Sequence, residues 1–117
     1  EKYFDAYNAY AVSKLANILF TYKLADLISH TNTTVNCLHP GVISTKLLQN
    51  GWGMGGASLE QGARTSVYLA DSEQVEGVSS KYYVDSMERK SVAISYDKKV
   101  QNRLWEISEN IMNTNIN

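Results

Sequence analysis

The sequence contains one cysteine, Cys37, one proline, Pro40, and two histidines among its 117 residues. A lone cysteine cannot form a disulfide within the chain, and these residues offer too few ligands for a zinc cluster, so we expect no metal site. No run approaches the roughly 18 apolar residues of a membrane span, and no basic-then-apolar secretory signal opens the chain. These absences favour a reducing compartment. We therefore expect a cytoplasmic location, with an upstream membrane anchor as the open alternative.

The chain also lacks an excess of either charge. It has 11 basic and 12 acidic residues, for a formal net charge of −1, so no general field attracts nucleic acid or an anionic membrane, and we expect neither partner. The length corresponds to one domain or less, and the 44% hydrophobic content is ordinary for a globular protein. The chain opens on Glu1 instead of methionine, which suggests that it is cut from a longer protein.

Apolar residues at helical spacing predict three helices, at about 5–29, 59–71 and 97–112. The first has Asp5 as its N-cap and apolar residues around much of its circumference, so we expect a sheet to cover one side and a partner the other. The other two have apolar stripes on one face. These stripes are Leu59, Ala63, Val67 and Ala70 in the second helix, and Val100, Leu104, Ile107 and Ile111 in the third.

Two segments predict strands. Residues 34–38 are β-branched and apolar and end at a Pro-Gly turn, which indicates a buried strand with Cys37 as a small core residue, and residues 81–84 form the second strand. A short helical segment is expected at 44–48. Because a helix returns into a strand and no repeat or linker intervenes, we expect one α/β unit.

The residues with the clearest chemistry lie on the first helix. Tyr10 and Lys14 are one turn apart, offset by about 40° around the axis, and Asn17 lies on the same face, where it equally suits a hydrogen bond to a neighbouring helix. A tyrosine with a reference pKa near 10 needs about 4 kcal/mol of added preference for phenolate to act near neutral pH. A cation at about 4 Å contributes about 4 kcal/mol at an effective dielectric near 20. The spacing alone fits equally a surface tyrosine packed along a lysine stem.

The context of this pair resembles a known family. Residues 10–20 (YAVSKLANILF) are similar to the active-site helix of the short-chain dehydrogenases/reductases, especially the retinol-dehydrogenase-like branch. Residues 38–45 (LHPGVIST) follow at the family's spacing and resemble its Pro-Gly loop after the sixth strand. The resemblance continues to residue 108 and covers essentially the whole chain. It implies the C-terminal portion of a Rossmann-like doubly wound parallel sheet.

The resemblance implies an oxidoreductase that moves a hydride between NAD or NADP and a carbonyl or alcohol substrate. The branch implies a lipophilic substrate such as a retinoid, a steroid or an aldehyde. Tyr10 would be the general acid–base, and Lys14 would make its phenol more acidic and hold the nicotinamide ribose hydroxyls. The family's cofactor-contacting loop positions are matched here by Pro40, Gly41, Val42, Ile43 and Thr45.

The resemblance also implies parts that precede this chain. The family's catalytic serine lies a dozen or more residues before the tyrosine, but the residues before Tyr10 here include no serine. The Gly-x-Gly-x-x-Gly match at 51–56 is not a dinucleotide fingerprint, because no strand leads into it. We therefore expect residues 1–117 to be the C-terminal catalytic portion of one domain, without its N-terminal nucleotide-binding part, and inactive alone. The alternative is a non-catalytic packing or dimerisation module, forming a homodimer through the first helix.

Overall fold

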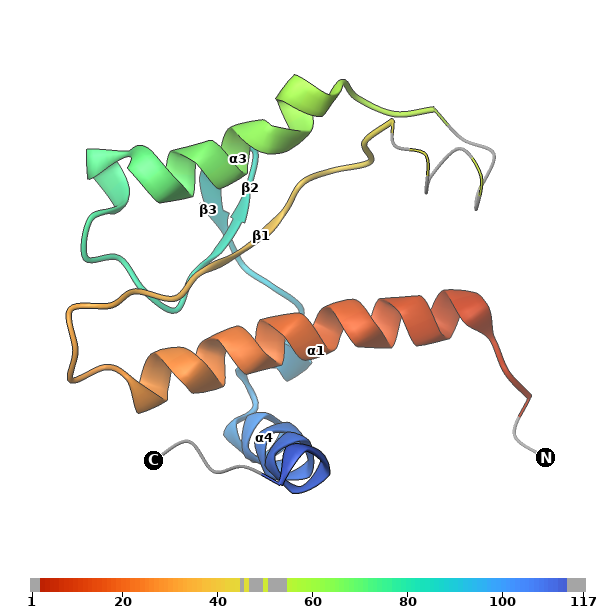
Figure 1. The fold of residues 1–117 in the computed structure, drawn as a ribbon, viewed down its shortest axis with the longest axis vertical. Helices are drawn as coiled ribbons and strands as arrows, with labels where there is room; N and C mark the ends of the chain where they lie inside the picture. Colours follow the sequence, from red (N-terminus) through yellow and green to blue (C-terminus); the bar gives the residue numbers. More distant parts are fainter. Residues whose placement is uncertain (1–2, 45, 47–49, 51–54, 114–117) are drawn as a thin grey trace.

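The elements stack in layers. The computed structural model describes residues 3–44, 46, 50 and 55–113. Helix α3 covers one face of a three-stranded sheet, α1 lies on the other side, and α4 packs beyond α1, seen nearly end-on in Figure 1. The elements are α1 (Ala6–Leu27), β1 (Cys37–His39), α3 (Leu59–Asp71), β2 (Tyr82–Val84), β3 (Met87–Arg89) and α4 (Lys98–Met112), with short 3₁₀ turns η1 (Glu73–Val75) and η2 (Ala93–Tyr96).

The sheet has the order β1-β2-β3. β1 and β2 are parallel, with Cys37 opposite Tyr82, and this parallel pair joined through a helix confirms the α/β expectation. β3 returns antiparallel to β2 through a tight turn in which Asp85 and Ser86 have φ of 51° and 58°. The sequence did not predict β3, because its three residues are exposed and the turn has no glycine to announce it.

β1 begins three residues later than expected. The N–H of Val35 donates to the Ser79 hydroxyl at 2.9 Å, and the side-chain amide of Asn36 donates to the Val78 carbonyl at 2.7 Å and accepts from the Lys81 N–H at 3.0 Å. Side chains thus replace part of the backbone ladder before Cys37. The strand is also half-buried at Cys37 and Leu38 and exposed at His39, so the expectation of a buried strand was wrong.

The predicted helix starts are confirmed by their caps. The Asp5 carboxylate accepts from the N–H of Tyr7 at 3.0 Å. Ser58 and Gln61 form the reciprocal capping box, with bonds of 2.9 and 3.2 Å, and Asp97 caps α4. Each cap satisfies N–H groups that the first helical turn leaves without partners, which is why these local signals were reliable.

The best-packed part of the molecule lies where the C-terminal half of α1 meets α4 and η2. Phe20 stacks on Trp105 and Tyr22 on Tyr96, each pair with ring centroids 5.3 Å apart. The Tyr22 hydroxyl also shares a 2.7 Å hydrogen bond with the Ser91 hydroxyl. In the N-terminal half of α1, by contrast, every described residue up to Lys14 is exposed. Only the C-terminal half of the helix is therefore covered, and on the side where a partner was expected it meets α4 of the same chain.

The predicted apolar stripe of α3 lies largely at the surface. Leu59 and Val67 are 63% and 60% exposed, whereas Thr65 is buried and accepts a 3.0 Å hydrogen bond from the N–H of Ser86. Tyr68 meets Tyr83 of β2 with centroids 6.2 Å apart. The hydrogen bond and the ring contact, not the aliphatic stripe, fix the face that α3 turns to the sheet.

The buried face of α4 also differs from its predicted apolar stripe. Gln101 and Trp105 are buried, while Ile107 and Ile111 of the predicted stripe are exposed. The Gln101 side-chain amide donates to the carbonyl of Ser95 at 2.8 Å, which makes a buried polar residue compatible with the contact to η2. Packing of the indole ring and this bond set the orientation of α4.

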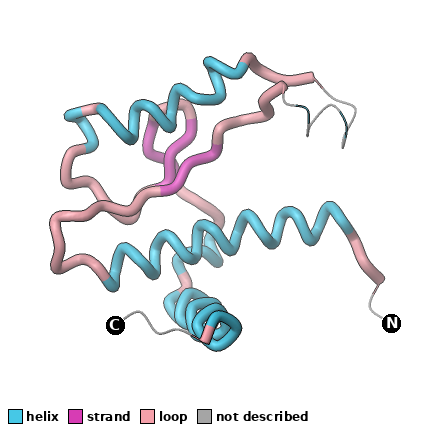
Figure 2. The backbone as a smooth tube through the Cα atoms, viewed as in Figure 1, coloured by secondary structure: helices cyan, strands magenta, loops and turns pink. Residues whose placement is uncertain are grey.

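A long connection that contains α3 separates β1 from β2, as Figure 2 shows. The expected helical segment at 44–48 falls mostly outside the described residues, and so does the glycine-rich stretch at 51–54. Gly77, in the loop before β2, has φ of 72°. No helix in the described part of the chain is both long and apolar enough to cross a bilayer.

Candidate active site

Tyr10 and Lys14 converge as their spacing predicts. The Lys14 ammonium nitrogen lies 5.2 Å from the centroid of the Tyr10 ring, within the range of a cation–π contact. The Tyr10 side chain is 49% exposed, and Lys14 is also exposed. The pair therefore places a positive charge beside a phenol that solvent and ligands can reach.

Two neighbouring side chains form hydrogen bonds along the same helix. The Ser13 hydroxyl donates to the Tyr10 carbonyl at 2.6 Å, and the Thr21 hydroxyl donates to the Asn17 carbonyl at 2.9 Å. Both are local bonds back to the preceding turn of the helix. Neither bond involves the side chain of Tyr10, Lys14 or Asn17.

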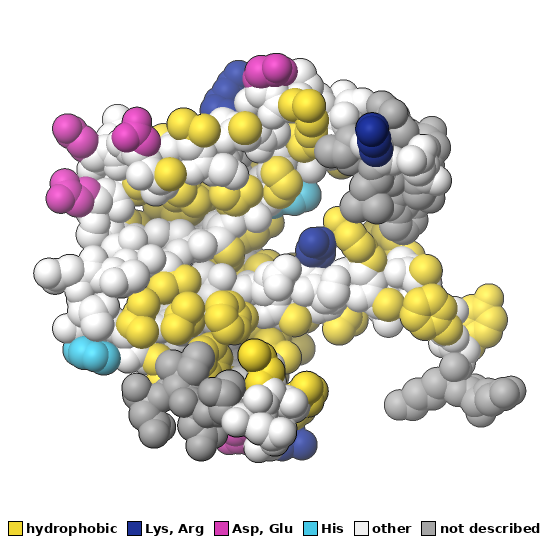
Figure 3. Space-filling view, viewed as in Figure 1, with side chains coloured by type: hydrophobic (Ala, Val, Ile, Leu, Met, Phe, Trp, Pro, Cys, Tyr) yellow, Lys and Arg dark blue, Asp and Glu magenta, His cyan; other side chains and the backbone are white. Residues whose placement is uncertain are grey.

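A groove of about 410 Å³ lies between β1 and the stripe of α1 that holds Tyr10 and Lys14. It brings the two sequence motifs together, because Tyr10 and Lys14 line one wall and Pro40 and Gly41 line the other. Figure 3 shows the hollow, with a basic side chain rising from α1 and a histidine on the opposite wall. The remaining lining residues are Tyr7, Ala11, Asn17, Ile18, Cys37, Leu38, His39 and Tyr82.

The Pro-Gly loop has the backbone geometry that its sequence requires. Gly41 has φ of 88°, in the left-handed region that favours glycine. Beyond it, Ile43 forms a parallel bridge with Ala57: the Ala57 N–H donates to the Val42 carbonyl and the Ser44 N–H to the Ala57 carbonyl, both at 2.9 Å. In such a bridge the N–H and C=O of Ile43 point away from Ala57.

The predicted cofactor residues are only partly placed in the groove. Pro40 and Gly41 line it, whereas Val42 and Ile43 follow directly but are not among the lining residues. The Ile43 N–H and C=O form no hydrogen bond with the described part of the chain. Thr45 lies outside the described residues.

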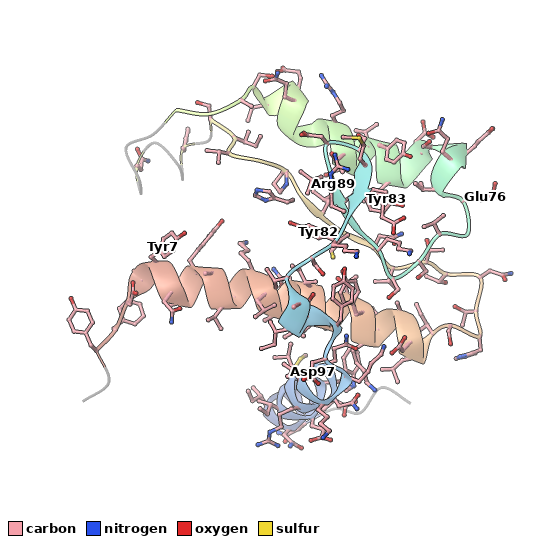
Figure 4. The ribbon with its side chains drawn as sticks, turned by 180° about the vertical axis from the view of Figure 1, so that it is seen from behind. Tyr7, Glu76, Tyr82, Tyr83, Arg89 and Asp97 are labelled. Atoms are coloured by element: carbon pink, nitrogen blue, oxygen red, sulfur yellow. The ribbon has the colours of Figure 1, made fainter. Side chains whose placement is uncertain are left out.

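Eight groove residues were not predicted as site residues, and the four of them with ionisable side chains are Tyr7, Cys37, His39 and Tyr82. Figure 4 shows Tyr7 projecting from α1 towards the sheet, where Tyr82 lies on β2. The spacing of Tyr7, three residues before Tyr10, was a usable signal because such residues share a helix face. Cys37, His39 and Tyr82 enter the groove through the pairing of β1 with β2, which the sequence does not reveal.

The permanent charge among the described lining residues of the groove is positive. None of its described lining residues is an aspartate or a glutamate, so Lys14 carries its only permanent charge. Burial raises the pKa of the Cys37 thiol, an effect that a hydrogen bond with Thr21 partly offsets, and burial also raises the pKa of Tyr82. Both groups are therefore neutral near pH 7.

Comparison with known proteins identifies the family of the two motifs. The sequence model of the short chain dehydrogenases matches residues 1–53, a range that holds both the Tyr10–Lys14 stripe and the Pro40–Gly41 loop. The chain is 42% identical to human retinol dehydrogenase 14 over 114 residues, which are 86% of this chain and 34% of that protein. The chain belongs to the short-chain dehydrogenase family. Its α/β arrangement is consistent with part of that family's Rossmann-like fold.

Other relatives point to the same branch of the short-chain dehydrogenases. Human polyprenol dehydrogenase is 34% identical over 90% of the chain and 36% of its own length. Mouse retinol dehydrogenase 12 is 35% identical over 92% of the chain and 37% of its own length. The chain thus spans about a third of the length of the curated relatives it matches.

Proposed function

We propose that the protein containing this chain is an NAD(P)-dependent oxidoreductase that interconverts a carbonyl and an alcohol. The observation that carries the proposal is the Lys14 ammonium 5.2 Å from the Tyr10 ring, in a groove whose other wall is the Pro40–Gly41 loop. If Tyr10 were only a surface tyrosine packed along the Lys14 side chain, the pair would not need to lie opposite the Pro40–Gly41 loop.

Tyr10 is the general acid–base in this proposal. Its hydroxyl gives a proton to the substrate oxygen during carbonyl reduction and takes one from the alcohol during oxidation. The nicotinamide supplies or accepts the hydride. Lys14 favours the phenolate form of Tyr10 by its charge and holds the ribose hydroxyls of the cofactor with its N–H donors.

The Pro-Gly loop suits the nicotinamide end of the cofactor. Gly41 brings backbone to the groove wall without a side chain, and Pro40 fixes its own φ. The N–H and C=O of Ile43 offer one donor and one acceptor, which match the two polar groups of a carboxamide. We assign cofactor contacts to the backbone of Val42 and Ile43 and to the hydroxyl of Thr45.

A lipophilic substrate fits the apolar part of the groove. Ala11, Ile18 and Leu38 line it together with the rings of Tyr7 and Tyr82. The names of the relatives, retinol and polyprenol dehydrogenases, favour the same substrate class. A retinoid, a steroid or a long-chain aldehyde is the proposed substrate.

The proposal assigns residues 1–117 to the C-terminal catalytic portion of a single Rossmann-like domain. The catalytic serine and the glycine-rich pyrophosphate turn then belong to the N-terminal portion of the same domain, so this chain alone should be inactive. A cytoplasmic location is part of the proposal and rests on the sequence argument from the lone Cys37.

The test compares the full-length protein with the isolated 117-residue chain. Each is mixed with NADH or NADPH and with retinal, a long-chain aldehyde or a steroid ketone, and cofactor oxidation is followed by absorbance. The full-length protein should oxidise one cofactor with at least one carbonyl, and the isolated chain should oxidise neither. Turnover by the isolated chain would contradict the division of the site, and a full-length protein that binds no nicotinamide cofactor would contradict the enzyme proposal.

A homodimer through α1 is a second proposal, supported by an exposed apolar residue on the far side of the helix from Tyr10. Val12 is 55% exposed. Sedimentation of the full-length protein and of its Val12→Asp variant tests this proposal. We expect a dimer that the substitution dissociates, and a monomeric wild-type protein would exclude it.

A further inference from the structure

Two glycines outside the Pro-Gly motif pack against Ile43. Gly56 lies beside the bridge between Ile43 and Ala57, and a Cβ atom built on it would sit 2.8 Å from the Ile43 carbonyl carbon and closer still to the Val42 carbonyl oxygen. Such a separation from backbone atoms is too short for any side chain. Alanine at position 56 would therefore push the backbone of Val42 and Ile43 away from Ala57.

Gly62, in the first turns of α3, meets Ile43 through its side chain. A Cβ atom on Gly62 would lie 2.8 Å from Ile43 Cγ1 and 3.0 Å from both Cγ2 and Cδ1. Three atoms of one side chain would be crowded at once, so either the isoleucine side chain or the start of α3 would have to move. Ile43 is thus held by its backbone against residues 56–57 and by its side chain against α3.

Backbone conformation does not explain these glycines. The positive-φ glycines among the described residues are Gly41 and Gly77, so Gly56 and Gly62 have backbones that other residues adopt. Gly55 differs from both, because a Cβ atom there would meet no atom of the described residues within 4 Å, apart from its own chain neighbours. What positions 56 and 62 require is space for the close approach of Ile43.

We propose that Gly56 and Gly62 are positioning residues for the nicotinamide site, because they let Ile43 sit where its N–H and C=O point away from Ala57 and can meet the carboxamide. The inference rests on the proposed function, since Ile43 is assigned there to the cofactor. It goes beyond that function by adding two residues that touch neither cofactor nor substrate. Their effect passes through the backbone bridge and through the Ile43 side chain.

The first experiment compares Gly56→Ala with Gly55→Ala in the full-length protein. The two substitutions add the same methyl group to adjacent residues, one against backbone atoms and one into open space. Cofactor affinity is measured by NADH or NADPH fluorescence titration, turnover by absorbance, and stability by thermal unfolding. Because a misplacement of about 1 Å can lower a reaction rate by about 100-fold, we expect Gly56→Ala to lower turnover by roughly 10- to 100-fold and to weaken cofactor binding, and Gly55→Ala to leave both unchanged.

Hydrogen exchange provides a readout that does not depend on the cofactor. The Ser44 and Ala57 amides donate the two bonds of the bridge. Their exchange should be faster in Gly56→Ala than in Gly55→Ala. A Gly56→Ala protein that melts earlier but keeps wild-type cofactor affinity would show a purely structural glycine and overturn the inference.

A second pair of variants decides the matter if Gly56→Ala does not fold. Gly62→Ala should weaken cofactor binding in the wild-type background, and it should weaken binding less in an Ile43→Ala background, which lacks all three crowded atoms. Such coupling is expected for residues in contact and absent for independent ones. Additive effects on the dissociation constant would overturn the inference. A wild-type protein without nicotinamide binding would instead refute the proposed function itself, so the two failures are distinguishable.

Discussion

The two halves of α1 have opposite surroundings. In the C-terminal half, where α1 meets α4 and η2, Leu19 and Tyr22 are 5% and 3% exposed. In the N-terminal half, Tyr7 and Tyr10 are 68% and 49% exposed beside the groove. One continuous helix thus has a fixed end and an accessible end. The packed half gives the accessible half a rigid support, which is what the proposed acid–base role of Tyr10 requires.

Two tyrosines on this helix illustrate the difference. Burial raises the pKa of Tyr22 well above its usual value, and the hydroxyl bonds to Ser91 while the ring stacks on Tyr96. Tyr22 is thereby kept neutral and serves packing. Tyr10 has a lysine over its ring and a groove in front of it. The same residue type has a structural part at one end of α1 and a proposed chemical part at the other.

The largest effect on the packed half is expected from Trp105→Ala. The substitution removes the indole ring that stacks on Phe20 and is 7% exposed, and truncating a buried tryptophan costs about 3–5 kcal/mol. Urea unfolding followed by circular dichroism gives this change. Ile111→Ala, at a 77% exposed position of the same helix, is the control and should change stability by at most about 0.5 kcal/mol. Equal effects would mean that the α1–α4 contact is not the core described here.

The next effect is expected from Lys14→Met on the accessible half. Methionine keeps most of the aliphatic stem but loses the charge and the N–H donors, and a hydrogen bond to a charged group contributes about 1.5–3 kcal/mol. Cofactor affinity in the full-length protein should fall by roughly 10- to 100-fold, with a melting temperature close to that of wild type. Lys23→Met, on the packed half, is the control and should leave cofactor affinity unchanged. An unaltered dissociation constant for Lys14→Met would remove this residue from the cofactor site.

The smallest effect concerns the pH dependence of Cys37 alkylation. The thiolate is the reactive form, and because burial raises the pKa of this thiol, a smaller fraction is ionised at any pH below that pKa. Its iodoacetamide labelling rate should keep rising at pH values where that of free cysteine has levelled off. Bound cofactor should slow the labelling further, since Cys37 lines the groove. A labelling midpoint at or below that of free cysteine would show that the thiol is not half-buried against β2 and α1.

Local signals made the helices and their caps predictable. Asp5, Asp97 and the Ser58–Gln61 capping box act within one turn of the residues they cap, so the sequence contains both partners of each bond. The Tyr10–Lys14 convergence is equally local. The loop at residues 38–45, which forms the opposite wall of the groove, was singled out only by its resemblance to a family motif. No local signal places this loop near α1, because their approach depends on tertiary contacts.

Tertiary contacts determined what the sequence did not predict. The start of β1 depends on the Asn36 side chain reaching residues 42 and 45 positions further along the chain. The orientations of α3 and α4 follow from Thr65 and Trp105, whereas the aliphatic stripes suggested other faces. Tyr82 enters the groove only through the parallel pairing of β1 and β2.

The most direct test of the central claim is the turnover of Tyr10→Phe in the full-length protein, with Tyr7→Phe as the control. Both variants remove one hydroxyl from a groove tyrosine on the same helix face. General acid–base catalysis contributes about 10²–10⁴-fold, so Tyr10→Phe should lower kcat by about that factor at an unchanged cofactor dissociation constant, and Tyr7→Phe should retain most of the activity. Wild-type turnover by Tyr10→Phe would contradict the assignment of Tyr10 as the acid–base residue.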